Sequence, residues 1–490
     1  MSILLREKIR RKFARWKNFL PVNRQRNFIK YYLQPSEVKK RNKRKYIHFD
    51  LRNKYYREWI KFLLKSENWD KKQIAEYQLD EIKRIVRYAY ENTEGYKMLY
   101  DRAGIKPEMI RTIEDFRKIP FTTKEIIRDN LEDFSVKIRG RKYTATGGST
   151  GNPFGFYRDK LSFSKELASK AYQYHRLGWK EGDRQMIFRG LAISSQNHMR
   201  YYPRFNELRC SSYHLTPEWM EIYRQKAFEF KPKWIKCYPS SGYIFAQFLK
   251  ETGRPFPPLK GVLCASENLY DFQKKLLSEV FKTRIFSHYG HYEMAALAGF
   301  CECEDTYHVL PQYGYAELLG KNDNLVTESG KIGEIVGTSF IMHATPFIRY
   351  KTQDLALFKG WGCSSCGRPY QIWERIEGRL QELIITATGR YLSTSMLNFH
   401  NDIYDHLQKF QFYQKEKGKV IFKFIPKKSC DEKIVKYIRA QLMTKLGDDI
   451  DLKMERVKKI PLTPRGKHRL LVQKMKLKYD DPSLMKSLAL

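Results

Sequence analysis

The sequence lacks long apolar runs, and none reaches the roughly 18 residues that a membrane-spanning helix needs. Its first twenty residues, MSILLREKIRRKFARWKNFL, contain no uninterrupted apolar stretch, so a cleaved secretory signal is not expected. Eight cysteines in 490 residues are too few and too scattered for a disulfide scaffold. We therefore expect a protein of the reducing cytoplasm.

Acidic residues are also scarce, with 54 Asp and Glu against 92 Lys and Arg and a formal net charge of +38. Such an imbalance bears on partners and solubility rather than on the fold. An apolar content of 42% is typical of a folded protein, and the length allows two to four domains. The excess of basic residues is greatest in residues 1–50, which hold 16 Lys or Arg residues and only three acidic residues.

The basic N-terminal segment has helical periodicity, because apolar side chains recur at Leu5, Ile9, Phe13, Trp16 and Leu20. A basic amphipathic helix of this kind is suited to the headgroup region of an anionic membrane. A helix packed on the rest of the protein with a solvated basic face is an equally ordinary reading, and nucleic acid is a third partner class. We expect a basic helical extension over residues 1–70.

Apolar stretches alternate with helical ones further along the chain. WIKCYP, LKGVLCAS and TRIFSHYG are separated from one another by segments such as GYIFAQFLKET and YDFQKKLLSEVF. This alternation predicts an α/β domain with mixed, mainly parallel sheets, which we place at residues 71–378. VIFKFIPK followed by EKIVKYIRAQLMTKL predicts a small α+β domain within residues 379–490.

One stretch, TATGGSTGNPFGF from Thr144 to Phe156, is rich in Gly, Ser and Thr. Backbone N–H groups and hydroxyls in such a loop can converge on a phosphate without obstruction by Cβ atoms. The P-loop pattern fails here, because Gly147 is followed by Gly151 too soon and Asn152 stands where lysine is required. Taken alone, the stretch is also compatible with a surface turn.

Five further segments follow in order: LCASENLYDFQKKL, SHYGHYEMA, FIRYKTQDLA, IEGRLQELI and LTPRGKHRLL. Together with the glycine-rich loop they resemble the motifs of the adenylate-forming ligases, the acyl-CoA synthetase superfamily. The likeness is closest to the phenylacetate–CoA ligase family and to its CapK-like branch in capsular polysaccharide biosynthesis. It covers roughly residues 75–480, and it is the order and spacing of the motifs together that make it specific.

The resemblance implies that most of these motifs bind ATP. The loop would hold the phosphates through Thr146, Gly147, Gly148, Ser149, Thr150 and Gly151. Glu267 would precede the adenine pocket, and Tyr289 with Gly290 would pack against adenine. Asp354 would accept the ribose hydroxyls, with Arg379 close to the ribose.

The resemblance also implies the catalytic residues. Glu293 would serve Mg²⁺, and Lys467 would be a mobile catalytic lysine that arrives with the small domain, about a hinge at residues 380–382. Two positions depart from the family pattern: Asn152 stands where lysine is frequent, and Gln353 where glycine is frequent. These departures leave open a degenerate fold that serves as a scaffold.

The function implied is an ATP-dependent, AMP-forming ligase that activates a small carboxylic acid as an acyl-adenylate and passes it to coenzyme A. Transfer to an amine or hydroxyl of a sugar is the alternative within the same class. A non-catalytic protein that grips nucleic acid or membrane is the alternative from another class. Against nucleic acid, the chain shows no recognised binding module, and its basic charge is concentrated at the ends.

Cysteine and histidine gather in two further segments. WGCSSCGR places Cys363 and Cys366 in a turn suited to two thiolates on one metal ion, and CECEDTYH offers Cys301, Cys303 and His308. We expect Cys301, His308, Cys363 and Cys366 to form a structural zinc site, with Cys301 chosen on the resemblance to the capsular branch. Reduced, unligated cysteines in two surface loops are the alternative, and a redox pair is a third reading.

Overall fold

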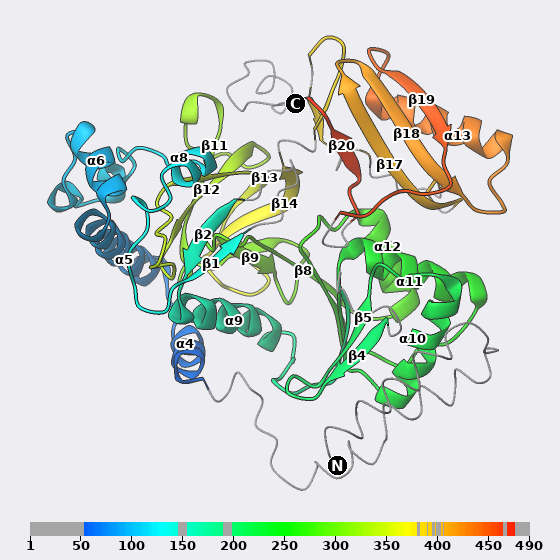
Figure 1. Cartoon of the computed structure of the whole chain (residues 1–490), viewed down its shortest axis with the longest axis horizontal. Coiled ribbons are helices and arrows are strands. Elements are labelled where there is room, and N and C mark those ends of the chain that lie inside the picture. Colours follow the sequence, from blue (N-terminus) through cyan, green and yellow to red (C-terminus); the bar gives the residue numbers. More distant parts are fainter. Residues whose placement is uncertain are drawn as a thin grey trace, which may run out of the picture. The chain divides into compact units, whose positions relative to one another are not determined.

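The structure is a computed structural model, shown as a ribbon in Figure 1. It describes residues 53–145, 154–189, 198–379, 383–389, 391–393, 397, 403–404, 406–463 and 468–475. Internal contacts divide the chain into residues 1–48 and 49–490, and all described residues belong to the second unit. Among the helices that are described, none is long and apolar enough to cross a membrane.

The helices of the described part are amphipathic, and most are capped by a polar side chain. They are α4 (Lys54–Lys65), α5 (Lys71–Asn92), α6 (Glu94–Arg102), α7 (Ile113–Phe116), α8 (Lys124–Asp129), α9 (Lys160–His175), α10 (Pro217–Phe230), α11 (Pro239–Thr252), α12 (Asp271–Phe281) and α13 (Glu432–Leu446), with short 3₁₀ turns η2 (Pro107–Met109) and η3 (Lys321–Asp323).

The segment from Asp80 to Gly104 has apolar residues at the spacing of one helix, such as Ile82, Ile85 and Val86, but it belongs to two helices. Helix α5 ends at Asn92 and α6 begins at Glu94. Between them Thr93 has extended backbone angles, and its hydroxyl accepts the N–H of Tyr96 as the cap of α6. A threonine in this role ends one helix and starts the next, which periodicity alone does not reveal.

The large sheet holds twelve described strands in the order β11-β12-β13-β14-β10-β9-β8-β7-β6-β3-β5-β4. Their bounds are β3 (Gln185–Arg189), β4 (Met199–Tyr202), β5 (Glu207–Ser211), β6 (Trp234–Cys237), β7 (Gly261–Ala265), β8 (Ile285–Gly290), β9 (Leu297–Phe300), β10 (Tyr307–Val309), β11 (Gly314–Leu319), β12 (Ile332–Ser339), β13 (Tyr350–Trp361) and β14 (Gln371–Arg379).

The predicted α/β class is confirmed, and the parallel pairing is confined to one half of this sheet. The neighbours in the run β5-β3-β6-β7-β8 pair in parallel. The neighbours in the run β8-β9-β10-β14-β13-β12-β11 pair antiparallel. The expectation of a mainly parallel sheet therefore holds only where helices alternate with strands. The other described strands follow one another without an intervening α-helix, and they pair antiparallel because a parallel pair needs a longer crossover connection.

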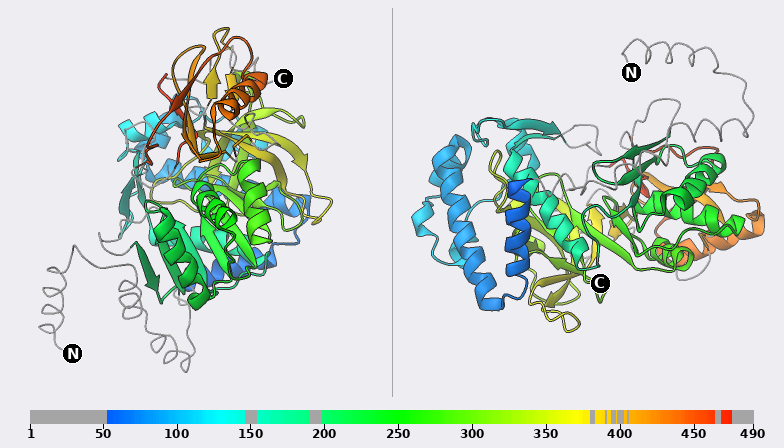
Figure 2. Two further views of the ribbon diagram at one scale, coloured as in Figure 1. Left: turned by 90° about the vertical axis from the view of Figure 1, so that its right-hand side faces the viewer. Right: turned by 90° about the horizontal axis from the view of Figure 1, so that it is seen from below.

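Helices cover both faces of the parallel half (Figures 1 and 2). On one face α10, α11 and α12 pack against alternate strand residues such as Phe188, Ile235 and Cys264. On the other face α9 covers Leu263 and Phe286 in the main core. Helix α4 also packs against α9, so the described end of the predicted N-terminal extension is part of this layer.

Two small sheets and a hairpin complete the chain. The hairpin pairs β1 (Lys142–Ala145) with β2 (Gly155–Arg158), and β15 (Leu383–Ile385) pairs with β16 (Tyr391–Ser393). The last sheet has the order β19-β18-β17-β20, from β17 (Leu407–Glu416), β18 (Lys419–Pro426), β19 (Asp451–Arg456) and β20 (Leu471–Gln473), and α13 packs on it. This is the predicted α+β unit; the domain bounds at 70/71 and 378/379 stay predictions.

Candidate functional site

Two predicted nucleotide-binding residues meet across the large sheet. Tyr289 lies near the carboxyl end of β8 and Asp354 near the start of β13, and the Tyr289 hydroxyl donates to Asp354 Oδ2 at 2.9 Å. Asp354 is buried, and burial together with this carboxylate holds the pKa of Tyr289 well above its usual value. The phenol therefore stays protonated and fixes the orientation of the carboxylate.

Arg379, the last residue of β14, is the register partner of Asp354 in β13. Its backbone is described, and its side chain lies outside the described part of the structure. The backbone register thus brings together two residues that the motifs assign to the ribose. That both contact the ribose stays a prediction.

Gln353 adopts a left-handed backbone conformation, with φ of 63°. Its backbone N–H donates to Glu334 Oε1 at 3.0 Å, and its side chain is exposed. Glycine takes this conformation without steric cost, which explains why it is frequent in the motif. The departure at Gln353 therefore preserves the backbone geometry that precedes Asp354.

Glu293, the predicted magnesium residue, is buried. The hydroxyl of Tyr350 donates to its Oε1 at 3.3 Å, and His291 Nδ1 lies 3.3 Å from its Oε2. Burial and the adjacent carboxylate hold the pKa of Tyr350 well above its usual value, so the phenol remains a donor. A buried carboxylate held in this way offers the oxygen donor that Mg²⁺ prefers.

The predicted phosphate loop, Thr146 to Gly151, lies outside the described residues, but both strands that flank it are described. They form an antiparallel hairpin in which Ala145 pairs with Gly155. A Cβ atom at Gly155 would overlap the hydroxyl end of Tyr143, an exposed side chain that would then have to turn away. The chemistry assigned to the loop itself stays a prediction.

The hairpin is anchored by aromatic packing. The ring of Phe154 stacks against Tyr350 with centroids 6.3 Å apart, and Phe156 packs on Phe347 at 5.3 Å. The Tyr350 hydroxyl also contacts Glu293, so Phe154, the first described residue after the loop, packs on the same tyrosine as the predicted magnesium residue.

Glu267 bridges two backbone groups. Its Oε2 accepts the N–H of Ser240 in the first turn of α11 at 3.0 Å, where a carboxylate is favoured. Its Oε1 accepts the N–H of His468 at 3.1 Å. His468 directly follows Lys467, which lies outside the described residues, as do hinge residues 380–382. Gly290, the last residue of β8, is exposed next to Tyr289.

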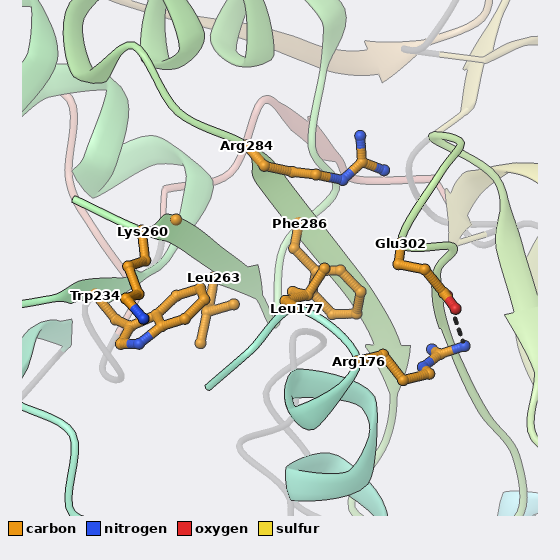
Figure 3. A pocket seen from close by; sticks show the side chains of 9 residues that line it. Arg176, Leu177, Trp234, Lys260, Leu263, Arg284, Phe286 and Glu302 are labelled. Atoms are coloured by element: carbon orange, nitrogen blue, oxygen red, sulfur yellow. Dashed lines mark ion pairs between the residues drawn. The ribbon is translucent and has the colours of Figure 1, made fainter. Parts of the chain in front are cut away.

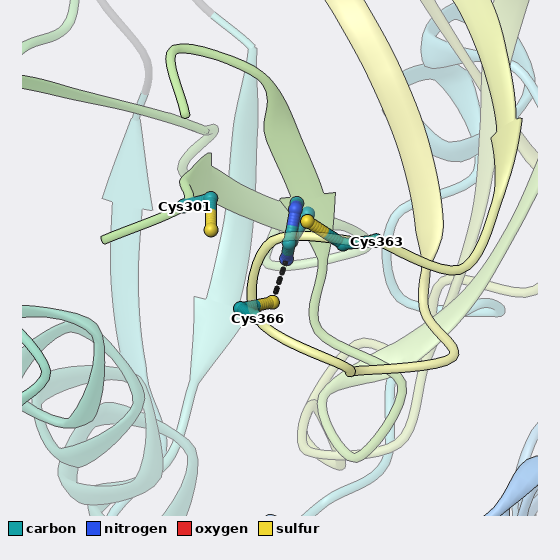
Figure 4. A group of neighbouring side chains, drawn as sticks. Cys301, Cys363 and Cys366 are labelled. Atoms are coloured by element: carbon teal, nitrogen blue, oxygen red, sulfur yellow. Dashed lines mark hydrogen bonds between the residues drawn. The ribbon is translucent and has the colours of Figure 1, made fainter. Parts of the chain in front are cut away.

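The four predicted metal ligands also lie together. The ligand atoms of Cys301, His308, Cys363 and Cys366 are all within 4.8 Å of one another, and only Cys366 is partly exposed. Figure 4 shows the three sulfur atoms turned toward a common centre. Cys303, which the sequence also offered, is exposed and lies outside this group.

A cavity of about 240 Å³ lies elsewhere, at the amino ends of the parallel strands (Figure 3). Trp234 and Gly261, the first residues of β6 and β7, line it, and Arg176 pairs with Glu302 across its wall at 3.4 Å. Ligands of open α/β sheets bind at the carboxyl ends of the strands, where Tyr289 lies. This cavity is therefore separate from the candidate nucleotide site.

Three residues of the site received no role from the sequence: His291, Tyr350 and Glu334. The first two stand inside quoted motifs, but their contacts with Glu293 depend on strands that pairing rules do not identify. Glu334 in β12 belongs to no motif. Only its burial and its bond to Gln353 reveal it.

Glu334 predicts a pH dependence of stability. Burial raises the pKa of this carboxyl to about 7, from an unfolded value near 4.5. Between these values the unfolded chain is ionised while the folded chain keeps the proton, so stability falls as pH rises. Ionising the Glu334 carboxyl in the folded protein would lower the free energy of unfolding by on the order of 3 kcal/mol, a large part of the stability of a typical protein.

We expect Glu334→Gln to remove this dependence, because the amide stays neutral and still accepts the Gln353 N–H. Urea denaturation of the full chain from pH 5 to 8 should show the variant gaining stability over the wild type as pH rises. Glu328→Gln, at an exposed glutamate before β12, is the control and should leave the profile unchanged. A constant difference between Glu334→Gln and wild type would contradict the assignment.

Comparison with known proteins bears on the fold and the resemblance. Residues 384–474 match the family model of the CapK C-terminal domain. The chain is 23% identical over 452 residues to protein CapK of Staphylococcus aureus, covering 86% of this chain and 93% of that protein. It is 24% identical to phenylacetate–coenzyme A ligase of Pseudomonas putida, covering 64% of this chain and 72% of the enzyme.

Among solved structures, 2-hydroxyisobutyryl-CoA ligase in the postadenylation state aligns with a TM-score of 0.65. The alignment covers 84% of this chain and 90% of that one at 18% identity, which establishes the fold alone. The predicted resemblance is confirmed: the chain has the fold of the adenylate-forming ligases, with a CapK-type C-terminal domain, and is similar to the CapK-like branch of the phenylacetate–CoA ligase family.

Proposed function

We propose that this chain is an AMP-forming ligase that activates a carboxylic acid with ATP and passes the acyl group to coenzyme A in polysaccharide biosynthesis. In the first step a carboxylate oxygen attacks the α-phosphorus of ATP, and the bond to the β-phosphate breaks to release pyrophosphate. In the second step a thiolate attacks the acyl carbon and AMP leaves.

The observation that carries the proposal is the Tyr289–Asp354 hydrogen bond across the sheet, with Arg379 in register with the aspartate. A buried carboxylate that is oriented by a protonated phenol is preorganised to accept a pair of vicinal hydroxyls. The ribose of ATP presents such a pair. Asp354 would therefore position the nucleotide and discriminate against analogues that lack these hydroxyls.

The charge of ATP must be neutralised before a second anion can approach. Mg²⁺ held by Glu293 would stabilise charge on the departing pyrophosphate. The hairpin loop at Thr146 to Thr150 would supply N–H groups and hydroxyls to the β- and γ-phosphates. Its anchoring on Tyr350, which contacts Glu293, supports a shared phosphate site.

Lys467 would complete the site. An ammonium on a flexible stem suits a group that arrives with a mobile domain and contacts carboxylate and α-phosphate as charge shifts between them. The contact of His468 N–H with Glu267 supports the approach of this segment to the nucleotide side of α11. Both Lys467 and the loop stay predictions of the sequence.

The acceptor is tested by measuring AMP and acyl product from a panel of aryl, fatty and amino acids, with and without coenzyme A. We expect a preferred acid to yield a thioester only when coenzyme A is present. Turnover that requires an amino sugar or a hydroxyl instead would establish the alternative acceptor. ATP cleavage to ADP would contradict both.

We further propose that the enzyme is cytoplasmic and that residues 1–50, which lie outside the described part, attach it to anionic membrane. Each basic residue near such a surface contributes about 1 kcal/mol, and the attraction is screened within roughly 8 Å at physiological salt. Sedimentation with anionic vesicles should be lost on deleting these residues and on raising salt. A full chain that ignores such vesicles would contradict the proposal.

A further inference from the structure

One pair of neighbouring strands in the large sheet, β10 and β14, is joined by only two paired positions. It divides the sheet into two halves in a new sense: β3 to β10, with Tyr289, and β11 to β14, with Asp354. The two paired positions are Tyr307 with Trp373 and His308 with Ile372, which we call the β10–β14 seam. By contrast, β13 and β14 pair along most of their length. A two-residue pairing contributes few hydrogen bonds, so the seam needs other support.

The cysteine and histidine cluster spans this seam. Cys301 follows β9 and His308 lies in β10, on the side of Tyr289. Cys363 and Cys366 lie in the turn between β13 and β14, on the side of Asp354. Each half of the sheet thus contributes two of the four side chains, and Cys366 Sγ lies 3.8 Å from His308 Nδ1.

The cluster combines three cysteine thiols with one imidazole, which are ligand types that zinc prefers. His308 is 2% exposed, and its Nε2 has no hydrogen-bond partner among the described residues. The N–H of Cys303 points at Cys301 Sγ at 3.3 Å, which suits an anionic sulfur. Zinc–ligand bonds of about 2.0–2.3 Å place the ligand atoms of a tetrahedral site roughly 3.5–3.8 Å apart, a small contraction from 4.8 Å.

Ion pairs join the two segments that carry the cluster, the loop after β9 and the turn between β13 and β14. Arg368, two residues after Cys366, donates to Glu302 at 2.5 Å, and Lys359 in β13 donates to Glu304 at 3.1 Å. These pairs already join the loop after β9 to the turn after β13. The four ligands are therefore presented by a framework that does not depend on the metal alone.

We propose that Cys301, His308, Cys363 and Cys366 bind one Zn²⁺ as a closed structural site that clamps the β10–β14 seam. Four protein ligands leave no open position for substrate, so the ion has no part in the chemistry. Its effect reaches the nucleotide site through packing. Trp373, paired across the seam, contacts the ring of Tyr289 with centroids 5.7 Å apart.

The first experiment measures metal binding and not activity. A negative result is therefore distinguishable from a failure of the proposed ligase function. Full-length protein prepared without chelator should contain about one zinc per chain by elemental analysis. Replacement by Co²⁺ should give the absorption of a tetrahedral thiolate site. Cys363→Ser should lose the metal, whereas Cys303→Ser, at the exposed neighbour, should keep it. No zinc and no cobalt spectrum would overturn the site.

The clamp is tested by removing the metal from the wild-type chain with a strong chelator, which avoids dependence on a variant that fails to fold. We expect the melting temperature to fall by at least about 5 °C and to recover on adding zinc, since metal binding is partly folding energy. A second readout is a several-fold loss of AMP affinity, which rests on the proposed nucleotide site. The melting temperature does not depend on that site. An unchanged melting temperature in metal-free protein would overturn the clamp.

Discussion

Lys467→Ala should lower the rate of acyl-adenylate formation by about 10²–10³-fold while ATP binding changes by no more than a few-fold. Loss of one preorganised group that stabilises transition-state charge has an effect of that size. Because the lysine would act only as the carboxylate attacks, its removal should not weaken the ground-state complex. Single-turnover pyrophosphate release and equilibrium ATP titration measure the two quantities.

A nearby lysine provides the control for this experiment. Lys459 is exposed in the same C-terminal segment, and no motif includes it. Lys459→Ala should therefore form adenylate at the wild-type rate, which separates the effect of position 467 from the loss of one positive charge among many. Normal adenylate formation by Lys467→Ala would show that the terminal motif is misassigned.

Asp354→Ala should weaken binding of ATP and AMP by about 10²-fold and remove the preference for ribose. A hydrogen bond to a charged group contributes about 1.5–3 kcal/mol, and each 1.4 kcal/mol is tenfold in affinity. The decisive comparison is ATP against 2′,3′-dideoxy-ATP. The wild type should discriminate between them, whereas the variant should bind both equally weakly.

Tyr289→Phe is the matched control, because it keeps the ring and the carboxylate and removes only the hydroxyl that contacts Asp354. We expect a loss of affinity of a few-fold with the ribose preference retained. Thermal melting identifies any variant that is unfolded. Equal discrimination by wild type and Asp354→Ala would place the ribose elsewhere.

The sequence predicted the parallel half of the sheet because helices and strands alternate there at a regular spacing. It also predicted where the motifs stand along the chain, since their residue types are read directly. It could not predict the antiparallel half, because periodicity does not say which strands pair. The contact between Tyr289 and Asp354 depends on that pairing, so it emerges only from the structure.

The same limit applies to the side chains that support the site. Glu334 lies in an ordinary-looking strand, and its role follows from its burial and from the left-handed backbone at Gln353. The cysteine and histidine cluster was accessible to sequence reasoning, because the types and spacing of Cys363 and Cys366 are distinctive. Its position across the β10–β14 seam was not, since the seam is a property of the fold.

The site around Tyr289, Asp354 and Glu293 is proposed to join a carboxylic acid to AMP. The most direct test of this proposal is exchange of labelled pyrophosphate into ATP, measured for wild type and Asp354→Ala across the acid panel. We expect exchange that depends on an added acid and is lost in the variant. Cleavage of ATP to ADP and phosphate, or exchange that Asp354→Ala leaves unchanged, would contradict it.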